Sequence, residues 1–292
     1  MIFKIPCKDT LILVELEGKS ELTESYMAKN QTFWKRYLTN SDDIKLEKKE
    51  DIDALEEGLE SLSWHEGASR VVKQIKKTPA TLGEEIGNSV THAVMAVFFL
   101  GMIPYASIRA FSNAPAGKES LDAFGIAAYM ITSFLMFLAS TWYHSTKRGT
   151  SHKYVTGKLD HCMMFVCIAG TYTPIWLSLI GGGLGIGMCI AQWCLTLAGV
   201  LFKSLMYAKS KASKIISWTI YILSGWLIIF CASAFFHAAS RPCFWLVIAG
   251  SLCYTVGLIF FAGKYKFAHM VWHILLDFGA ICHFIGIVGF LR

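Results

Sequence analysis

Long apolar stretches, separated by short polar connections, dominate the chain after residue 80. A helix that crosses a bilayer needs about 20 mainly apolar residues. On that criterion the pattern predicts seven spanning helices, at 86–109, 121–143, 159–180, 184–206, 215–237, 242–262 and 268–291. The glycine run at 181–185 makes the boundary between the third and fourth spans the least sharply defined. The pattern therefore predicts an all-α fold, a seven-transmembrane helical bundle over residues 81–292.

Residues 1–80 follow a different pattern, because they are polar and hold most of the acidic side chains. We expect a cytosolic N-terminal region that is partly helical or disordered. Within it, 44–60 is typical of a helix rich in Glu and Lys, and 62–80 of an amphipathic segment lying on the membrane surface. The first residues lack a basic start followed by a sustained apolar core, so no signal peptide is expected.

Composition and charge narrow the class of protein further. The chain is 54% hydrophobic and 16% charged, which is too apolar for an ordinary soluble domain. Its net charge of +6 comes mainly from Lys and Arg in the apolar part, with no basic stripe on a soluble domain, so a nucleic-acid partner is not expected. Eight of the nine cysteines lie inside apolar stretches without a CxxC pair, as small buried hydrophobes do.

The basic residues alternate between the two sides of the predicted bundle. The connections after spans two, four and six hold clusters of lysine, whereas those after spans one and five hold only Arg109, Lys118 and Arg241. By the positive-inside rule the N-terminus is cytoplasmic and the C-terminus lies on the far side. This orientation is opposite to that of a G-protein-coupled receptor.

Polar side chains inside membrane spans are candidates for function. The alternating spans bring eight of them to one level near the cytoplasmic face: Glu85, Asn88, His92, Ser140, His144, Asp160, His269 and His273. His269 and His273 are four residues apart and therefore share one helix face. Ser140 and His144 have the same relation. Each face must turn toward the bundle interior, because the other side is lipid.

Three histidines with an open fourth position form a common set of ligands for catalytic zinc. His144, His269 and His273 are the trio that the topology favours, so the expected cofactor is Zn²⁺. The HMVWH segment lacks the glutamate of an HExxH helix, and Asp160 is the carboxylate best placed to act on a metal-bound water. The alternative is that these histidines are interfacial residues bonded to carbonyls or water.

Three further residues are less well defined by the sequence. For His92 and His283 we expect hydrogen bonds to neighbouring helices or to the metal ligands. Asp277 lies one turn beyond His273, toward the middle of the membrane. It is either a buried protonated acid or part of a polar cavity, and the sequence leaves both interpretations open.

Several motifs in this order resemble those of the progestin and adipoQ receptor family, in particular its haemolysin III-like subgroup. They are EEIGNSVTH at 84–92, STWYH at 140–144, KLDH at 158–161 with the following GTYTP, and HMVWH at 269–273 with the later His283. The resemblance covers about 80–292. It implies zinc bound by His144, His269 and His273, with Asp160 acting through the zinc-bound water and Ser140 as the motif serine. Asp277 departs from the apolar or small residue expected at its position.

Three functions remain open at this stage. The resemblance extends to alkaline ceramidases, which implies zinc-dependent hydrolysis of a lipid amide by Asp160 and Ser140 within the membrane. The second is a signalling receptor with structural zinc and an unknown partner of residues 1–80. The third is a haemolysin III-type pore, which would need polar stripes across the whole membrane, whereas the far half of the spans is apolar apart from Asp277 and His283.

Overall fold

The computed structural model describes residues 2–7, 10–15, 82–147, 150–205, 211–263 and 266–291. The helices predicted at 44–60 and 62–80 lie outside these ranges. The chain divides into two compact units, of which the first contains an antiparallel hairpin of β1 (Ile2–Cys7) and β2 (Thr10–Glu15), with Ile2 opposite Glu15 and Cys7 opposite Thr10. The sequence interpretation did not predict these strands, although both segments are rich in β-branched and other apolar residues.

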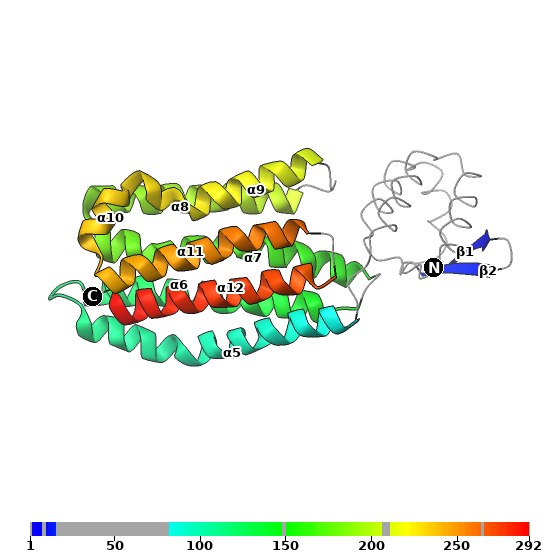
Figure 1. Ribbon diagram of the computed structural model, residues 1–292, viewed down its shortest axis with the longest axis horizontal. Helices are drawn as coiled ribbons and strands as arrows, with labels where there is room; N and C mark the ends of the chain where they lie inside the picture. Colours follow the sequence, from blue (N-terminus) through cyan, green and yellow to red (C-terminus); the bar gives the residue numbers. More distant parts are fainter. Residues whose placement is uncertain are drawn as a thin grey trace. The chain divides into compact units, whose positions relative to one another are not determined.

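The second unit is a helical bundle (Figure 1). Its elements are α5 (Leu82–Asn113), α6 (Glu119–Ser145), α7 (Ser151–Pro174), the π-helix η1 (Ile175–Ile180), α8 (Gly182–Leu205), α9 (Lys211–Gly225), the 3₁₀-helix η2 (Leu227–Cys231), α10 (Ala232–Ala238), α11 (Arg241–Ala262), α12 (Ala268–Phe284) and the π-helix η3 (Ile285–Gly289).

Seven helical stretches in the described residues are long and apolar enough to cross a membrane, which confirms the predicted number. They are Leu82–Asn113, Glu119–Ser145, His152–Ile180, Gly182–Leu205, Ile215–Ala238, Arg241–Ala262 and Ala268–Gly289. Many large apolar side chains on these helices are exposed, which suits contact with lipid rather than with water. The chain is therefore a multi-pass membrane protein.

The third and fourth spans meet at a very tight connection. α7 ends at Pro174, and the chain continues as the π-helix η1. Gly181 and Gly182 then adopt φ of 63° and 59°, in the left-handed region that glycine enters without a steric penalty. The glycine run therefore reverses the chain between the two spans with almost no loop.

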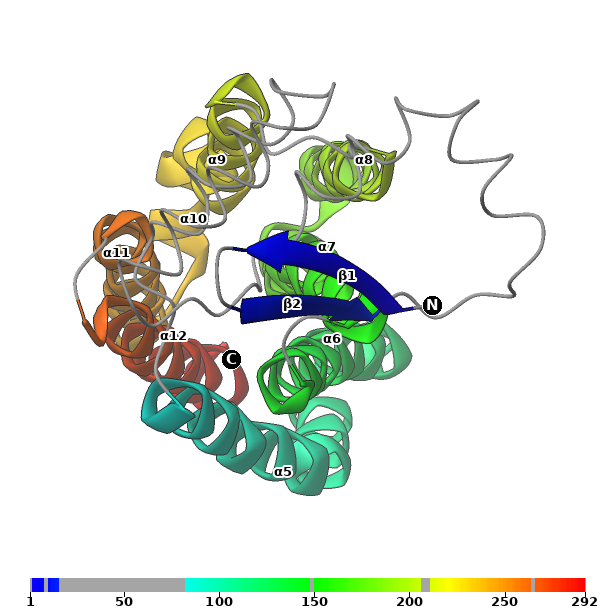
Figure 2. The same ribbon diagram turned by 90° about the vertical axis from the view of Figure 1, so that its right-hand side faces the viewer.

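Helix order in space determines which residues can meet. Seen along the bundle, α5 lies beside both α6 and α12, and α11 lies beside α12 (Figure 2). The C-terminal end of α6, the N-terminal ends of α5, α7 and α12, and the C-terminal end of α11 share one end of the bundle (Figure 1). Because successive helices run in opposite directions, residues as far apart in the sequence as 84 and 273 lie at the same end of the bundle.

Candidate metal centre

Three histidine side chains converge at that end of the bundle. His144 lies in the last turn of α6, whereas His269 and His273 occupy the first two turns of α12. Nε2 of His269 lies 3.4 Å from Nε2 of His144 and 3.2 Å from Nε2 of His273. One ligand atom from each ring lies within 4.8 Å of the others, so this buried group can hold a metal ion.

The spacing of these nitrogens fits the geometry of a tetrahedral zinc site. Zinc–nitrogen bonds of about 2.0–2.1 Å at tetrahedral angles place two ligand nitrogens about 3.3 Å apart. The two measured Nε2 separations, 3.2 and 3.4 Å, lie on either side of that value. Lone pairs that face one another at this distance repel unless a cation or a proton lies between them, so the donor set suits a bound metal.

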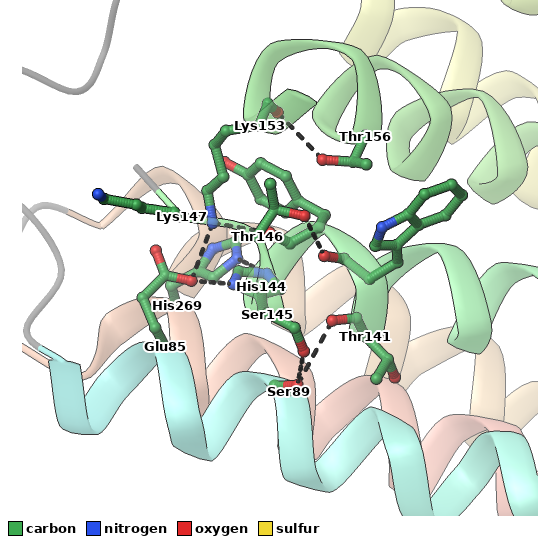
Figure 3. Close-up of polar contacts among 12 residues, drawn as sticks. Glu85, Ser89, Thr141, His144, Ser145, Thr146, Lys147, Lys153, Thr156 and His269 are labelled. Carbon is green, nitrogen blue, oxygen red and sulfur yellow. Dashed lines mark hydrogen bonds and ion pairs between the residues drawn. The ribbon is translucent and has the colours of Figure 1, made fainter. Parts of the chain in front are cut away.

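A carboxylate fixes the orientation of the first ligand. Nδ1 of His144 lies 2.7 Å from Oε2 of Glu85, on the first turn of α5 (Figure 3). A carboxylate only accepts hydrogen bonds, so Nδ1 carries the proton and Nε2 presents its lone pair to the other two histidines. A carboxylate bonded to a histidine in this way also orients the ligand in many metal sites.

A buried lysine completes this contact. Nζ of Lys153, on α7, donates to Oε2 of Glu85 at 3.2 Å and to the carbonyl oxygen of Tyr143 at 2.8 Å (Figure 3). It also lies 4.1 Å from the centroid of the Tyr143 ring. Only 4% of the Lys153 side chain is exposed, so its charge is balanced locally by Glu85 rather than by water.

Asp160 and Ser140 lie beside the first ligand. Ser140 is one turn before His144 on α6 and Asp160 is on α7, and both are buried. The Asp160 carboxylate lies near enough to Ser140 and to His144 to interact with both electrostatically. The structure thus brings a hydroxyl and a carboxylate to the edge of the histidine cluster.

Three further polar residues lie near the histidine cluster, namely Asn88, His92 and Asp277. The His92 ring stacks on the His273 ring, with centroids 3.8 Å apart. Its Nε2 lies 3.7 Å from Oδ1 of Asp277, which gives this aspartate a neighbour on α5. Asn88, one turn before His92, is fully buried, and its side-chain polar atoms have no hydrogen-bond partner in the described part of the chain.

His283 belongs to a different part of the bundle. Its Nε2 lies 3.0 Å from the carbonyl oxygen of Val247, on α11, and its ring packs edge-on against Tyr254. It lies ten residues beyond His273, in the last turn of α12. The structure therefore does not bring His283 to the metal ligands.

Two functional candidates were missed by the sequence interpretation. Lys153 was treated only as a positive charge of a cytoplasmic connection, and Glu84 was not singled out. Glu84 is 5% exposed, and its carboxylate accepts a hydrogen bond from the backbone N–H of Phe267, just before α12. The sequence did contain a sign of the role of Glu84. Two adjacent acidic residues stand at the start of an apolar span, where acidic residues are rare.

A partly open pocket of about 90 Å³ lies among the helices. Residues of α6, α7, α9, α11 and α12 line it, and most of them are apolar or aromatic, including Met136, Tyr221, Trp272 and Leu276. Trp272 is the immediate neighbour of the ligand His273. This lining suits an apolar group such as part of a hydrocarbon chain.

Comparison with known proteins agrees with the motifs. Residues 80–284 match the family described as haemolysin-III related. The chain is 32% identical to Hemolysin-3 of Bacillus cereus over 210 residues, which are 71% of this chain and 92% of that protein. It is 30% identical to the Hemolysin-3 homolog of Bacillus subtilis over 66% of this chain and 87% of the relative. It is also 25% identical to human monocyte to macrophage differentiation factor, over 72% and 86% of the two chains.

Proposed function

Because the chain belongs to the haemolysin-III related branch of the progestin and adipoQ receptor family, we propose that it is a zinc-dependent intramembrane hydrolase of a lipid amide. The observation that carries this proposal is the set of three imidazole Nε2 atoms with separations of 3.2 and 3.4 Å. A structural zinc site also has this spacing but needs no acid or hydroxyl beside it, and here Asp160 and Ser140 lie beside His144.

Each residue has a distinct task in this proposal. His144, His269 and His273 would hold the zinc, which supplies Lewis acidity toward a carbonyl oxygen and makes water more acidic. Asp160 would accept a proton at its carboxylate from the attacking water and pass it to the leaving amine nitrogen. Ser140 would donate a hydrogen bond that holds this carboxylate in place.

The reaction adds water across the amide. The water oxygen bonds to the carbonyl carbon, the carbon–nitrogen bond breaks, and the products are a carboxylic acid and an amine. The apolar pocket beside Trp272 would accept part of a hydrocarbon chain of the lipid and keep bulk water from the reacting carbon. A ceramide has the required chemistry, with one amide next to two long chains.

Metal content and turnover, measured on the detergent-purified full chain, test the proposal together. We expect the wild-type protein to hold one zinc per chain and to hydrolyse a fluorescent ceramide. His273→Ala should lose both properties, whereas His237→Ala, at an exposed site in α10, should keep both. A wild-type protein without zinc, or unchanged turnover in His273→Ala, would contradict the proposal.

Asp160→Asn separates the hydrolase from a receptor with structural zinc. The amide keeps the size of the side chain but cannot take a proton, so a hydrolase should lose at least about a hundredfold in turnover. The zinc content should stay the same, because Asp160 is outside the three-histidine group. A receptor whose zinc is structural should be almost insensitive to this change.

Membrane lysis is the second candidate function, because the name of the Bacillus cereus relative refers to haemolysis. It predicts the release of a small dye from lipid vesicles that contain the purified protein. If release occurs equally with the wild type and with Asp160→Asn, the pore function is supported over the hydrolase. Dye retention together with ceramide turnover supports the hydrolase.

A further inference from the structure

Glu84 and Glu85 are adjacent on α5 but contact different helices. Consecutive residues on an α-helix point about 100° apart. Accordingly, the Glu85 carboxylate contacts His144 on α6 and Lys153 on α7, whereas the Glu84 carboxylate accepts from the N–H of Phe267 at the start of α12. One turn of α5 therefore touches every helix that supplies a ligand.

The start of α12 has an unusual backbone. Phe267 precedes the helix with φ of 65°, the only non-glycine residue with positive φ in the ranges that the structure describes. This conformation is sterically unfavourable for a side chain as bulky as phenylalanine, and it persists only where the surroundings hold it. At this residue the backbone N–H donates a hydrogen bond to the Glu84 carboxylate.

The two helices approach closely at the same level. A Cβ atom placed on Gly87, one turn after Glu84, would lie 2.7 Å from Sδ of Met270 in the first turn of α12. Gly87 therefore faces the flexible side chain of Met270, next to His269. The contact between Glu84 and Phe267 lies at this joint and is partly buried, because Glu84 is 5% exposed and Phe267 is 38% exposed.

We propose that Glu84 is a positioning residue of the metal centre, a role that rests on the zinc site of the proposed function. His269 is only two residues after Phe267, and His273 follows one turn later. A change in where α12 begins would therefore move both Nε2 atoms relative to that of His144. Glu84 fixes this starting point, while Glu85 and Lys153 fix His144.

Zinc affinity of the full chain in detergent is the first test. Glu84→Ala removes the acceptor and should raise the Kd for zinc about tenfold or more, as changes to groups that orient ligands do. Glu84→Gln retains a neutral acceptor and should lie between Glu84→Ala and the wild type. The matched control is Glu119→Ala, in the first turn of α6 at the opposite end of the bundle, which should leave the Kd unchanged.

Cobalt spectra distinguish positioning from a general loss of stability. Co²⁺ at the three histidines should give visible absorption bands whose shape depends on ligand geometry. Glu84→Ala should change these bands, whereas a variant that is only less stable would lower the melting temperature and keep the wild-type bands. Unchanged bands, or a Kd within twofold of the wild type, would overturn the proposal.

Amide hydrogen exchange of the metal-free protein tests the joint without zinc. Exchange in the peptide covering residues 266–271 should be faster in Glu84→Ala than in the wild type, with partial protection restored in Glu84→Gln. Equal exchange in all three proteins would overturn the proposal. Should the wild type bind no zinc, the proposed function fails, whereas this exchange measurement still decides whether Glu84 holds the start of α12.

Discussion

Of the carboxylates near the histidine cluster, Glu85 and Asp277 differ in what they contact. Glu85 contacts a ligand directly, with Oε2 2.7 Å from Nδ1 of His144. Asp277 contacts His92, which stacks on His273 through its ring face and lies outside the three-histidine group. A carboxylate orients a metal-binding histidine chiefly through the hydrogen bond that it accepts from that histidine. Of Glu85 and Asp277, only Glu85 contacts one of the three histidines.

This difference predicts unequal effects on metal binding. Glu85→Ala should raise the Kd for zinc by about 10- to 100-fold, since His144 loses the acceptor that fixes its tautomer and ring orientation. Asp277→Ala should leave the Kd almost unchanged. Competition with a chelator of known affinity, on detergent-purified protein, measures both constants. Equal losses in the two variants would mean that Asp277 also acts on the ligands.

At the residue scale, spacing predicted part of the site and missed another part. The four-residue spacing in HMVWH and the alternation of spans were enough to group His269 and His273 with His144. The roles of Glu84 and Lys153 depend on contacts between residues 68 and 183 positions apart, for which no periodic pattern exists in one sequence. The sequence also did not predict the contact of Asp277 with His92, because the depth of a residue in the membrane does not determine which helix packs against it.

At the scale of elements, small residues determine how closely neighbouring helices pack. α11 and α12 meet at Gly250 and Gly279, where a Cβ atom on Gly250 would lie 2.8 Å from the carbonyl oxygen of Gly279. Within a membrane, packing rather than hydrophobic burial drives helix association, and small residues permit it. This contact helps to place α12, which carries two of the three histidines of the candidate metal centre.

Gly250→Ala should therefore destabilise the bundle. The added methyl group forces α11 away from α12, and overpacking of this kind costs about 1–3 kcal/mol of unfolding free energy. The control is Gly101→Ala in α5, where a Cβ atom would meet nothing within 4 Å and alanine is the better helix former. Thermal unfolding in detergent should give a lower melting temperature for Gly250→Ala only. Equal melting temperatures would show that the helices adjust without cost.

The positions of the elements were more predictable than their details. Every spanning helix predicted from apolar length is present, because a bilayer imposes a minimum length that random apolar runs rarely reach. The π-helices after Pro174 and Phe284 were not predicted, since their hydrogen-bond pattern leaves no mark in hydropathy. The hairpin formed by β1 and β2 was missed because it precedes the long polar segment on which the interpretation of residues 1–80 was based.

At the scale of the whole molecule, the distribution of basic residues predicts which side of the membrane the candidate metal centre faces. Among the described residues, Lys153, Lys158 and Lys266 lie at that end, close to the starts of α7 and α12. The other end holds Arg109, Lys118 and Arg241. The positive-inside rule counts basic residues in short connections, and the lysines at 209, 211 and 214 add to the first end. We therefore predict that the three histidines lie near the cytoplasmic face.

Reporter fusions in a bacterial host test this orientation. Alkaline phosphatase is active only outside the cytoplasm and green fluorescent protein folds efficiently only inside it, so the two reporters give opposite signals at each site. A fusion after Gly263, at the end of the sixth span, should be fluorescent with little phosphatase activity. A fusion at the C-terminus, after the seventh span, should be active as a phosphatase and dark. The reverse pattern at both sites would place the metal centre on the far side, where a substrate would have to reach it from the outer leaflet.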